Sequence, residues 1–319
     1  MAGLIAAHHQ DADAAREHLE RLLWPEGPIC PHCGIIGEAF KLNGKTTRKG
    51  LWKCSACREP FTVTVGTIFE DSKIPLHKWL LAIHLMCSSK KGISAHQLMR
   101  NLELGSYRTA WFMAHRVRWA MGQEPMVSKL AGIVEIDEAY IGGKKKYGPA
   151  FNREGERVNP LMGRKHPRTD KAEVVTLLQR GGDVRSYHAT ERVTGESLRP
   201  ALDALVEQGT HIMTDSAYKM RFETHGWKHS KVDHSKKEYA RHEDGLTITT
   251  NTVEGYFSIL KRGVNGIYHH VSKQYLDQYL REFDFRYNVR KMNDGDRTVL
   301  AVKKTHGKRL MLKEPRTKD

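Results

Sequence analysis

The sequence has no long hydrophobic run and no internal repeat or low-complexity segment. Its longest apolar run, Trp79 to Cys87, is far shorter than the ~20 residues of a membrane-spanning helix, which excludes an integral membrane protein. The first residues have no basic start before a short apolar stretch and soon carry acids, so we expect no secretory signal. These absences predict a cytoplasmic protein in a reducing compartment.

Acidic residues are in the minority. Lys and Arg total 52 against 37 Asp and Glu, and the formal charge is +15. A surplus of this size favours a polyanionic partner such as nucleic acid over a small neutral ligand. The alternative is a soluble protein that is merely basic. With 319 residues, the chain is long enough for several small modules or for one module and a larger domain.

Cysteine is scarce, and four of the five cysteines form two C-x-x-C pairs. Two such pairs across a short hairpin present four thiolates to one zinc ion, and a filled four-cysteine shell stabilises a fold without catalysing a reaction. The alternatives are two disulfides or a redox pair. His32, inside the first pair, could replace a cysteine as a zinc ligand, but we interpret it as a bystander. The fifth, Cys87, is interpreted as a small buried hydrophobe. The predicted zinc ligands are Cys30, Cys33, Cys54 and Cys57.

Helical periodicity appears before and after this zinc-ribbon module. Residues 11–24 predict one short helix that ends at Pro25, and residues 74–121 predict three helices with a break at Gly105. The last two resemble a helix-turn-helix, whose second helix meets DNA. A helical hairpin with a solvated basic face is the alternative. Side chains expected to be exposed along the last helix, where they would meet DNA, are Arg108, His115, Arg116 and Arg118.

An alternation typical of strands begins near residue 132. Three strands, one helix, a strand that ends in an acid, a weak strand and a last helix follow in order. Residues 144–171 are too polar and too rich in helix and strand breakers for regular structure. A loop of this length is usually functional or mobile.

Two carboxylates stand in strands that are otherwise apolar. Asp137 interrupts the first strand and Asp215 closes the fourth, and a buried acid is costly unless it is paired or bound to metal. By the alternation of a strand, Glu135 shares the face of Asp137 and Glu138 points to the opposite face. Two divalent ions held by such oxygens, Mg²⁺ above all, carry out phosphoryl transfer on DNA.

The last helix can supply a third acid. Asn251, Glu254, Ser258 and Lys261 fall on one face at helical spacing. Glu254 is then a candidate ligand and Lys261 a contact for a DNA phosphate. The local alternative is a capping box, with Asn251 as N-cap and Glu254 returning to its backbone. Capping leaves unexplained both Lys261 and the acids in the strands.

Long motifs then carry a family resemblance. "IVEIDEAYIGGK", "MTDSAY", "VDHSKKEYAR", "TNTVEGYFSILKRG" and "GIYHHVSKQYLDQYLREFDFRYNVR", with the cysteine pairs upstream, closely resemble the ISXO-like group of bacterial insertion-sequence transposases, family fifteen ninety-five. The resemblance covers about Ala14 to about Arg290. It implies a multidomain α/β protein with an RNase H-like mixed sheet, preceded by a zinc ribbon and a helical module. It also implies a DDE-type site, Mg²⁺-dependent end cleavage and strand transfer.

The resemblance also implies roles for individual residues. Asp137 matches the first acid, Asp215 the second and Lys261 the basic residue after the third position, which the family fills with Asn or Glu. We choose Glu254 over Asn251, because a carboxylate binds Mg²⁺ better than an amide. His234, Ser235 and Lys237 are expected near the site without a firm role. Further expected DNA contacts are Arg108, Arg116, Arg118, Lys261 and Arg262.

The expected organisation is a helix at 1–27, a ribbon at 28–66, a helical module at 67–128, a catalytic domain at 129–293 and a basic C-terminal tail at 294–319. Double-stranded DNA is the expected partner, in the nucleoid, with Mg²⁺ (or Mn²⁺) and structural Zn²⁺ as cofactors. Joining two DNA ends in one event calls for a homo-oligomer. The rival functions are an RNase H-like nuclease without strand transfer and a non-catalytic DNA-binding regulator.

Overall fold

The structure, a computed structural model, describes residues 4–122, 128–142, 150–151, 157–158, 171–191, 193–216 and 220–310. The chain divides into two compact units, residues 1–123 with 289–319, and residues 124–288. Most of the loop expected at 144–171 lies outside the described residues. No helix in the described parts of the chain is long and apolar enough to cross a membrane.

The first unit begins with a short 3₁₀ turn and helix α1, followed by a small three-stranded sheet. Asp11 caps α1 by accepting hydrogen bonds from the backbone N–H groups of Asp13 and Ala14, at 3.0 and 2.8 Å. The helix ends just before Pro25, as its sequence predicted. Two antiparallel strands flank the basic turn, as expected, and a third strand adds to them. The elements are η1 (Ala7–His9), α1 (Ala12–Leu23), β1 (Ala39–Lys41), β2 (Trp52–Cys54) and β3 (Pro60–Phe61).

Four helices complete the first unit, where the sequence predicted three. Serine side chains cap two of them, since Ser94 and Ser106 accept hydrogen bonds from backbone N–H groups in the following turn. The fourth helix lies in the segment expected as a tail. It carries the buried residues Thr298, Ala301 and Val302 at helical spacing, and Thr298 pairs with His84 at 3.0 Å. The helices are α2 (Leu76–Ser88), α3 (Ala95–Asn101), α4 (Tyr107–Met121) and α8 (Asp294–Lys303).

The second unit is built on a five-stranded mixed sheet of order β10-β9-β4-β7-β8. The three strands β4, β7 and β8 pair antiparallel, whereas β9 pairs parallel with β4 on one side and with β10 on the other. This is the RNase H-like arrangement that we expected. The strands are β4 (Ile133–Ile141), β7 (Ala172–Gln179), β8 (Val184–Ala189), β9 (His211–Asp215) and β10 (Lys228–Val232).

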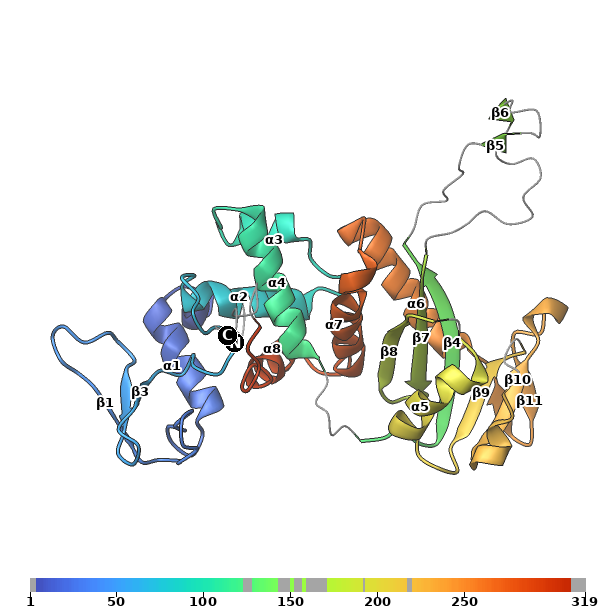
Figure 1. The fold of residues 1–319 in the computed structure, drawn as a ribbon, viewed down its shortest axis with the longest axis horizontal. Helices are drawn as coiled ribbons and strands as arrows, with labels where there is room; N and C mark the ends of the chain where they lie inside the picture. The colour runs from blue at the N-terminus through green and yellow to red at the C-terminus, as the bar shows by residue number, and fades with distance from the viewer. Residues whose placement is uncertain are drawn as a thin grey trace. The chain divides into compact units, whose positions relative to one another are not determined.

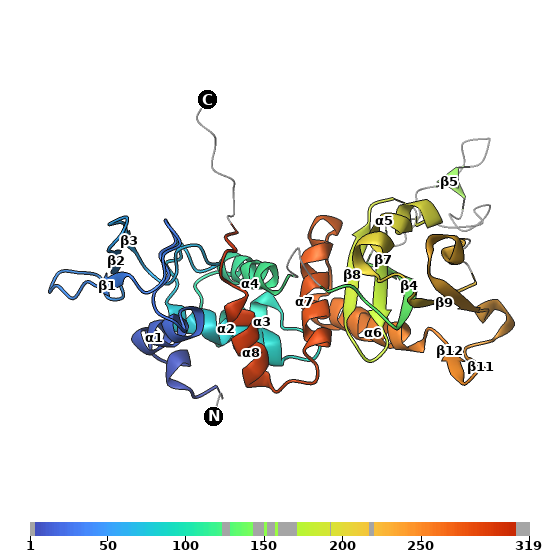
Figure 2. The ribbon, with the colours of Figure 1, turned by 90° about the horizontal axis from the view of Figure 1, so that it is seen from below.

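Helices cover both faces of this sheet (Figure 1 and Figure 2). On one face, Leu198 and Leu202 of α5 pack in a core with Val134 and Ile136 of β4. On the other face, α6 and α7 pack in a separate core that includes Ala139 of β4. The odd-numbered residues of β4 therefore face α6. The helices are α5 (Gly195–Leu205), α6 (Asn251–Gly263) and α7 (Leu276–Asn288).

Short elements connect these larger ones. The 3₁₀ turns η2 and η3 flank β10, and a two-stranded ribbon leads into α6. A π-helical turn follows α6 directly and a 3₁₀ turn precedes α7. A separate two-residue pair, β5 (Ala150–Phe151) and β6 (Arg157–Val158), is also described. The connecting elements are η2 (Phe222–His225), η3 (His234–Lys236), β11 (Arg241–Glu243), β12 (Leu246–Ile248), η4 (Val264–Tyr268) and η5 (Lys273–Tyr275).

Candidate functional site

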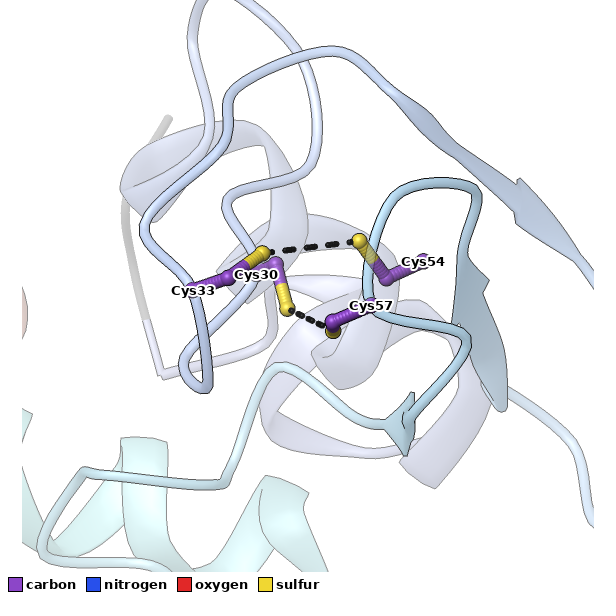
Figure 3. A group of neighbouring side chains, drawn as sticks. All are labelled: Cys30, Cys33, Cys54 and Cys57. Atoms are coloured by element: carbon purple, nitrogen blue, oxygen red, sulfur yellow. Dashed lines mark hydrogen bonds between the residues drawn. The ribbon is translucent and has the colours of Figure 1, made fainter.

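The four paired cysteines of the first unit meet at one point. Figure 3 shows the two knuckles facing each other, with sulfur–sulfur distances of 3.6 Å between Cys30 and Cys57 and 3.7 Å between Cys33 and Cys54. All four sulfurs lie within 4.8 Å of one another. Cys87 lies elsewhere, buried in α2. The cysteines are all free of disulfides, so the alternative of two disulfide bonds does not describe this structure.

This spacing fits a zinc ion. Four sulfurs at about 2.3 Å from one zinc lie roughly 3.8 Å apart along the edges of a tetrahedron, close to the two distances found here. Backbone N–H groups, first that of Cys57, lower the pKa of Cys54 to about 7, whereas burial and the neighbouring thiols raise the pKa of Cys57 to about 12. Four thiols this close do not all ionise on their own, and a bound zinc ion supplies the positive charge that their thiolate forms require. His32 is not part of the group. The predicted structural zinc site is thus fully assembled.

The two strand acids of the second unit lie on neighbouring parallel strands. The ladder between β4 and β9 pairs Ile136 with Thr214, so the next residues along the two strands are Asp137 and Asp215. Side chains at paired positions of parallel strands point to the same face, which here is the α6 face. The register therefore brings together two acids that are far apart in the sequence.

Helix α6 places its polar stripe beside Asp137. An open cavity of about 600 Å³ is lined by residues from β4, η3 and α6. Asn251 is exposed at the first position of α6 and is not among the lining residues, and neither is Asp215. Of the two candidates for the third acid position, only Glu254 faces the cavity. The lining residues are Asp137, Glu138, His234, Glu254, Phe257, Ser258, Lys261 and Arg262.

The electrostatics of Asp137 show that the acids act on one another. Burial, followed by the negative charges of Glu254 and Asp215, raises the pKa of Asp137 to about 6, while the backbone N–H of Glu138 and the charge of His234 work in the opposite direction. That N–H donates to the Asp137 carboxylate at 2.8 Å. A buried carboxylate with other acids beside it is a place where a cation would offset the charge.

The three carboxylates nevertheless stay apart. Among the described residues, the four cysteines are the one group with three or more metal-ligand atoms drawn close together. Like charges that share a cavity repel one another. In this structure Asp137 and Glu254 thus face one open cavity, with Asp215 on the strand next to Asp137, and we call these three acids the acid site.

Family comparisons match parts of both units. Residues 129–288 match the ISXO2-like transposase domain, a DDE-type domain, and residues 10–59 match the transposase zinc-ribbon domain. The chain belongs to the ISXO2-like transposase family. A protein in the transposable element ISH50 of Halobacterium salinarum is 28% identical over 273 residues, which are 85% of this chain and 89% of that protein. The resemblance stated from the motifs is confirmed.

Solved structures give weaker matches. The Mos1 strand transfer complex is 14% identical, with a TM-score of 0.28 over 71% of this chain and 74% of that chain. A pre-cleavage Mos1 transpososome is 13% identical, with a TM-score of 0.26 over 66% of this chain and 71% of that chain. The assignment of the RNase H-like fold therefore depends on the strand order and on the family match.

The start of α6 does not form the capping box that the sequence offered as an alternative. Thr250, not Asn251, is the N-cap, and its side chain caps nothing. Glu254 instead accepts a hydrogen bond from the Thr250 hydroxyl at 3.3 Å. The backbone N–H groups of Thr252 and Val253 donate to a distant acid, Glu135, at 2.8 and 3.0 Å. The capping-box interpretation is wrong because the cap comes from β4.

Glu135 is therefore not a candidate metal ligand, although its side chain shares a strand face with that of Asp137. It is fully buried and also pairs with Arg180. Glu138 lies at the cavity rim, even though the strand alternation sent it to the other face.

Two neighbours of the acids had no assigned role from the sequence. His234 lies 3.7 Å from the Glu254 carboxylate and 3.4 Å from the Thr250 hydroxyl. The Ser216 hydroxyl lies 3.0 Å from an Asp215 carboxylate oxygen and 3.3 Å from an Asp233 oxygen. In the sequence, His234 could be noticed because it lies in the motif "VDHSKKEYAR". Ser216 could be noticed only because it follows Asp215. Ser235 and Lys237 are not among the residues that line the cavity.

Lys261 lies between two cavities. It lines the acid cavity and a second one of about 380 Å³, which includes Lys171 and Asn265. Its ammonium group is 6.0 Å from the centre of the Phe257 ring, one turn earlier. The Arg262 side chain is held back along the helix by Ser258.

The helical module corrects one expectation. Arg108 is exposed at the start of α4, but His115, Arg116 and Arg118 are buried. The Arg116 guanidinium lies over the rings of Trp79 and Phe112, at 5.5 and 5.6 Å, and donates to the Glu70 carbonyl at 2.8 Å. The expected exposure was wrong because the other helices of the unit cover the second half of α4.

Proposed function

We propose that this transposase cleaves the ends of its element and joins the freed 3′ ends to target DNA, with Asp137, Asp215 and Glu254 as the acids of the reaction. The observation that carries the proposal is geometric: the pairing of β4 with β9 sets Asp137 beside Asp215, and Glu254 of α6 lines the same cavity as Asp137. Burial, and after it the charges of Glu254 and Asp215, raises the pKa of Asp137 to about 6. Acids from β4, β9 and α6 thus act on one another around Asp137, where a divalent cation would offset their charge.

Oxygens of Asp137, Asp215 and Glu254 would hold the metal ions. Bound there, two Mg²⁺ or Mn²⁺ ions supply activation of the attacking oxygen and charge neutralisation at phosphorus. Lys261, which lines the same cavity, binds a phosphate next to the scissile one. Its ammonium group is a point charge on a flexible stem, suited to a phosphate whose exact position changes during the reaction.

The reaction has two displacements at phosphorus. In the first, water attacks the scissile phosphate at the element end, and the 3′ oxygen leaves as a free 3′-hydroxyl. In the second, this hydroxyl attacks a phosphate of the target strand, and a target 3′ oxygen leaves. One active site serves both steps, because the attacking and leaving groups are oxygens in each. The site must therefore accept two DNA molecules in turn.

Recognition of DNA falls to the first unit and to the overall charge. The net charge of +15 favours binding to the phosphate backbone in a salt-dependent way. Arg108 is exposed in the first turn of α4, the end of a recognition helix that meets base edges and phosphates. Because two element ends are joined in one event, the proposed active form is a homo-oligomer on double-stranded DNA.

The test uses linear DNA that carries the element's own ends. With Mg²⁺ the parent protein should cleave these ends, and with pre-cleaved ends it should yield joined products. Asp137→Asn and Asp215→Asn should each lower both rates at least a thousandfold while DNA binding persists. Asp203→Asn is the matched control, because Asp203 is exposed on α5 and pairs only at 3.6 Å with Arg199.

The rival functions give other results. Cleavage without any joined product would indicate a nuclease. Binding without Mg²⁺-dependent cleavage, in the parent as in the variants, would indicate a regulator.

The third acid has a test of its own. We expect Glu254→Gln to abolish cleavage and Asn251→Ala to reduce it less than tenfold, because Glu254 faces the cavity and Asn251 does not. Loss of cleavage in Asn251→Ala alone would move the third ligand to Asn251.

A further inference from the structure

One buried carboxylate near the site takes no part in the chemistry described above. Glu135 has no exposed surface and lies two residues before Asp137 on β4. A buried acid is costly unless its oxygens are well paired. Its pairing is extensive, and all of it ties β4 to the start of α6.

Both oxygens of Glu135 are used. One accepts from the Arg180 Nε and Nη2 atoms at 3.0 and 2.9 Å and from the Thr252 hydroxyl at 2.9 Å. The other accepts from the backbone N–H groups of Thr252 and Val253 at 2.8 and 3.0 Å. A carboxylate at a helix N-terminus is favoured by the unpaired N–H groups and by the helix dipole.

Arg180 extends this contact to the chain that leads into α6. Its Nη1 atom donates to the Thr247 carbonyl at 2.8 Å, and its Nη2 atom lies 3.3 Å from the Thr249 carbonyl. Its own backbone N–H donates to the Ile133 carbonyl at 2.9 Å. The guanidinium therefore fixes the last residues before the helix against β4 and β7.

We propose that Glu135, held by Arg180, is the positioning residue of the acid site, setting the distance of Glu254 and Lys261 from Asp137. The inference depends on the proposed function of these residues. Glu135 and Asp137 are about 7 Å apart along one face of one strand. Glu254 follows directly after the capped residues, Thr252 and Val253. No local side chain caps α6, so the strand that carries the first acid also fixes the helix that carries the third.

A variant that removes charge but keeps shape tests this role. Glu135→Gln can accept hydrogen bonds through only one of its two side-chain termini, so it releases either Arg180 or the N–H groups of α6. Glu282→Gln is the matched control. Glu282 is also fully buried and pairs with Arg286 and Tyr268, away from the start of α6. We expect both variants to lower the melting temperature.

The deciding measurement is a titration of the zinc-loaded full chain with Mn²⁺. The electron paramagnetic resonance signal of free Mn²⁺ reports how much of the ion is bound. Mn²⁺ does not displace zinc from four thiolates. We expect Glu135→Gln to raise the Kd for Mn²⁺ at least tenfold and Glu282→Gln to change it less than twofold. Hydrogen exchange of the peptide that contains Thr252 and Val253 should speed up only in Glu135→Gln.

If Glu135→Gln does not fold, Arg180→Lys replaces it as the test variant. It keeps the positive charge but loses the paired donors, and we expect a Kd raised three- to tenfold. An unchanged Kd, with faster exchange at Thr252 and Val253, would overturn the positioning role. Failure of the proposed function looks different, because the parent and Asp137→Asn would then bind Mn²⁺ equally.

Discussion

The zinc ribbon and the acid site arrange their candidate metal ligands in opposite ways. In the ribbon, two short knuckles hold four sulfurs within 4.8 Å of one another. In the acid site, β4 and α6 bring the carboxylates of Asp137 and Glu254 to an open cavity of about 600 Å³, and β9 places Asp215 beside Asp137. A filled site stabilises a fold, whereas an open one leaves room for substrate.

The difference follows from where each set of ligands gets its geometry. Local turns shape the cysteine knuckles, so the spacing of the cysteines in the sequence nearly determines the geometry of the site. The acid site depends instead on the β4 and β9 register and on the packing of α6. Burial, and after it repulsion by Glu254 and Asp215, raises the pKa of Asp137 there to about 6. The first predictions below separate one site from the other, and the last concerns the helical module.

Removal of zinc has the largest expected effect. Chelation at neutral pH should unfold the ribbon, because structural zinc contributes on the order of 10 kcal/mol to such small domains. The second unit has its own cores and should stay folded. Hydrogen exchange before and after chelation checks this. Cys54→Ser should reproduce the effect, and an unchanged exchange rate in residues 28–61 would refute the zinc assignment.

The pH dependence of stability comes next. Asp137 has a folded pKa of about 6 against an ordinary value of 3.8, so its protonated form is favoured in the fold. Its contribution to stability is complete below pH 3.8 and is lost as the pH rises through 6, by about 3 kcal/mol at most. Urea unfolding between pH 4 and 7 should show this loss, and Asp137→Asn should remove it.

Asp284 is the internal comparison for that experiment. Burial also raises its pKa to about 6, but it lies under α6, bonded to Tyr256 and Ser186. Its variant Asp284→Asn should flatten the same pH range. Added Mg²⁺ should stabilise the parent near pH 7 and leave Asp137→Asn unchanged. If Mg²⁺ stabilised both alike, the ion would be bound elsewhere.

The two arginines of α4 give the smallest effects and are easily distinguished. Arg116→Ala should lower the free energy of unfolding by about 2 kcal/mol, because it removes a buried hydrogen bond and packing on two rings. Arg108→Ala should leave stability within about 0.5 kcal/mol and reduce the salt dependence of DNA binding by about one phosphate contact. Urea unfolding and binding titrations at several salt concentrations measure both. The reverse pattern would contradict the burial of Arg116.

Much of this fold could be predicted from the sequence. The alternation around Asp137 and the helical spacing around Leu198 predicted β4 and α5, and both are confirmed. The helix that replaces part of the expected tail was missed because the basic residues around α8 hid a short buried stripe. The exposure of Arg116 and Arg118 was wrong because burial of α4 depends on helices distant in the sequence.

The site divides in the same way. Cysteine spacing alone predicted that the four sulfurs meet, and the structure places them within 4.8 Å of one another. The cap of α6 could not be predicted, since it joins Glu135 to Thr252 and Val253 across more than a third of the chain. The spacing of Asn251 and Glu254 resembles a capping box in the sequence. Only the folded structure shows that Glu135 caps the helix instead.

The most direct test of the central claim exchanges an oxygen ligand for sulfur, the element that serves the ribbon. Asp137→Cys, Asp215→Cys and Glu254→Cys should each be at least a hundredfold slower than the parent in Mg²⁺, because a hard ion binds thiolate poorly. In Mn²⁺, cleavage of element ends should recover at least tenfold in the cysteine variants and not in the matching alanine variants. Equal activity of cysteine and alanine variants in both metals, at all three positions, would contradict the account.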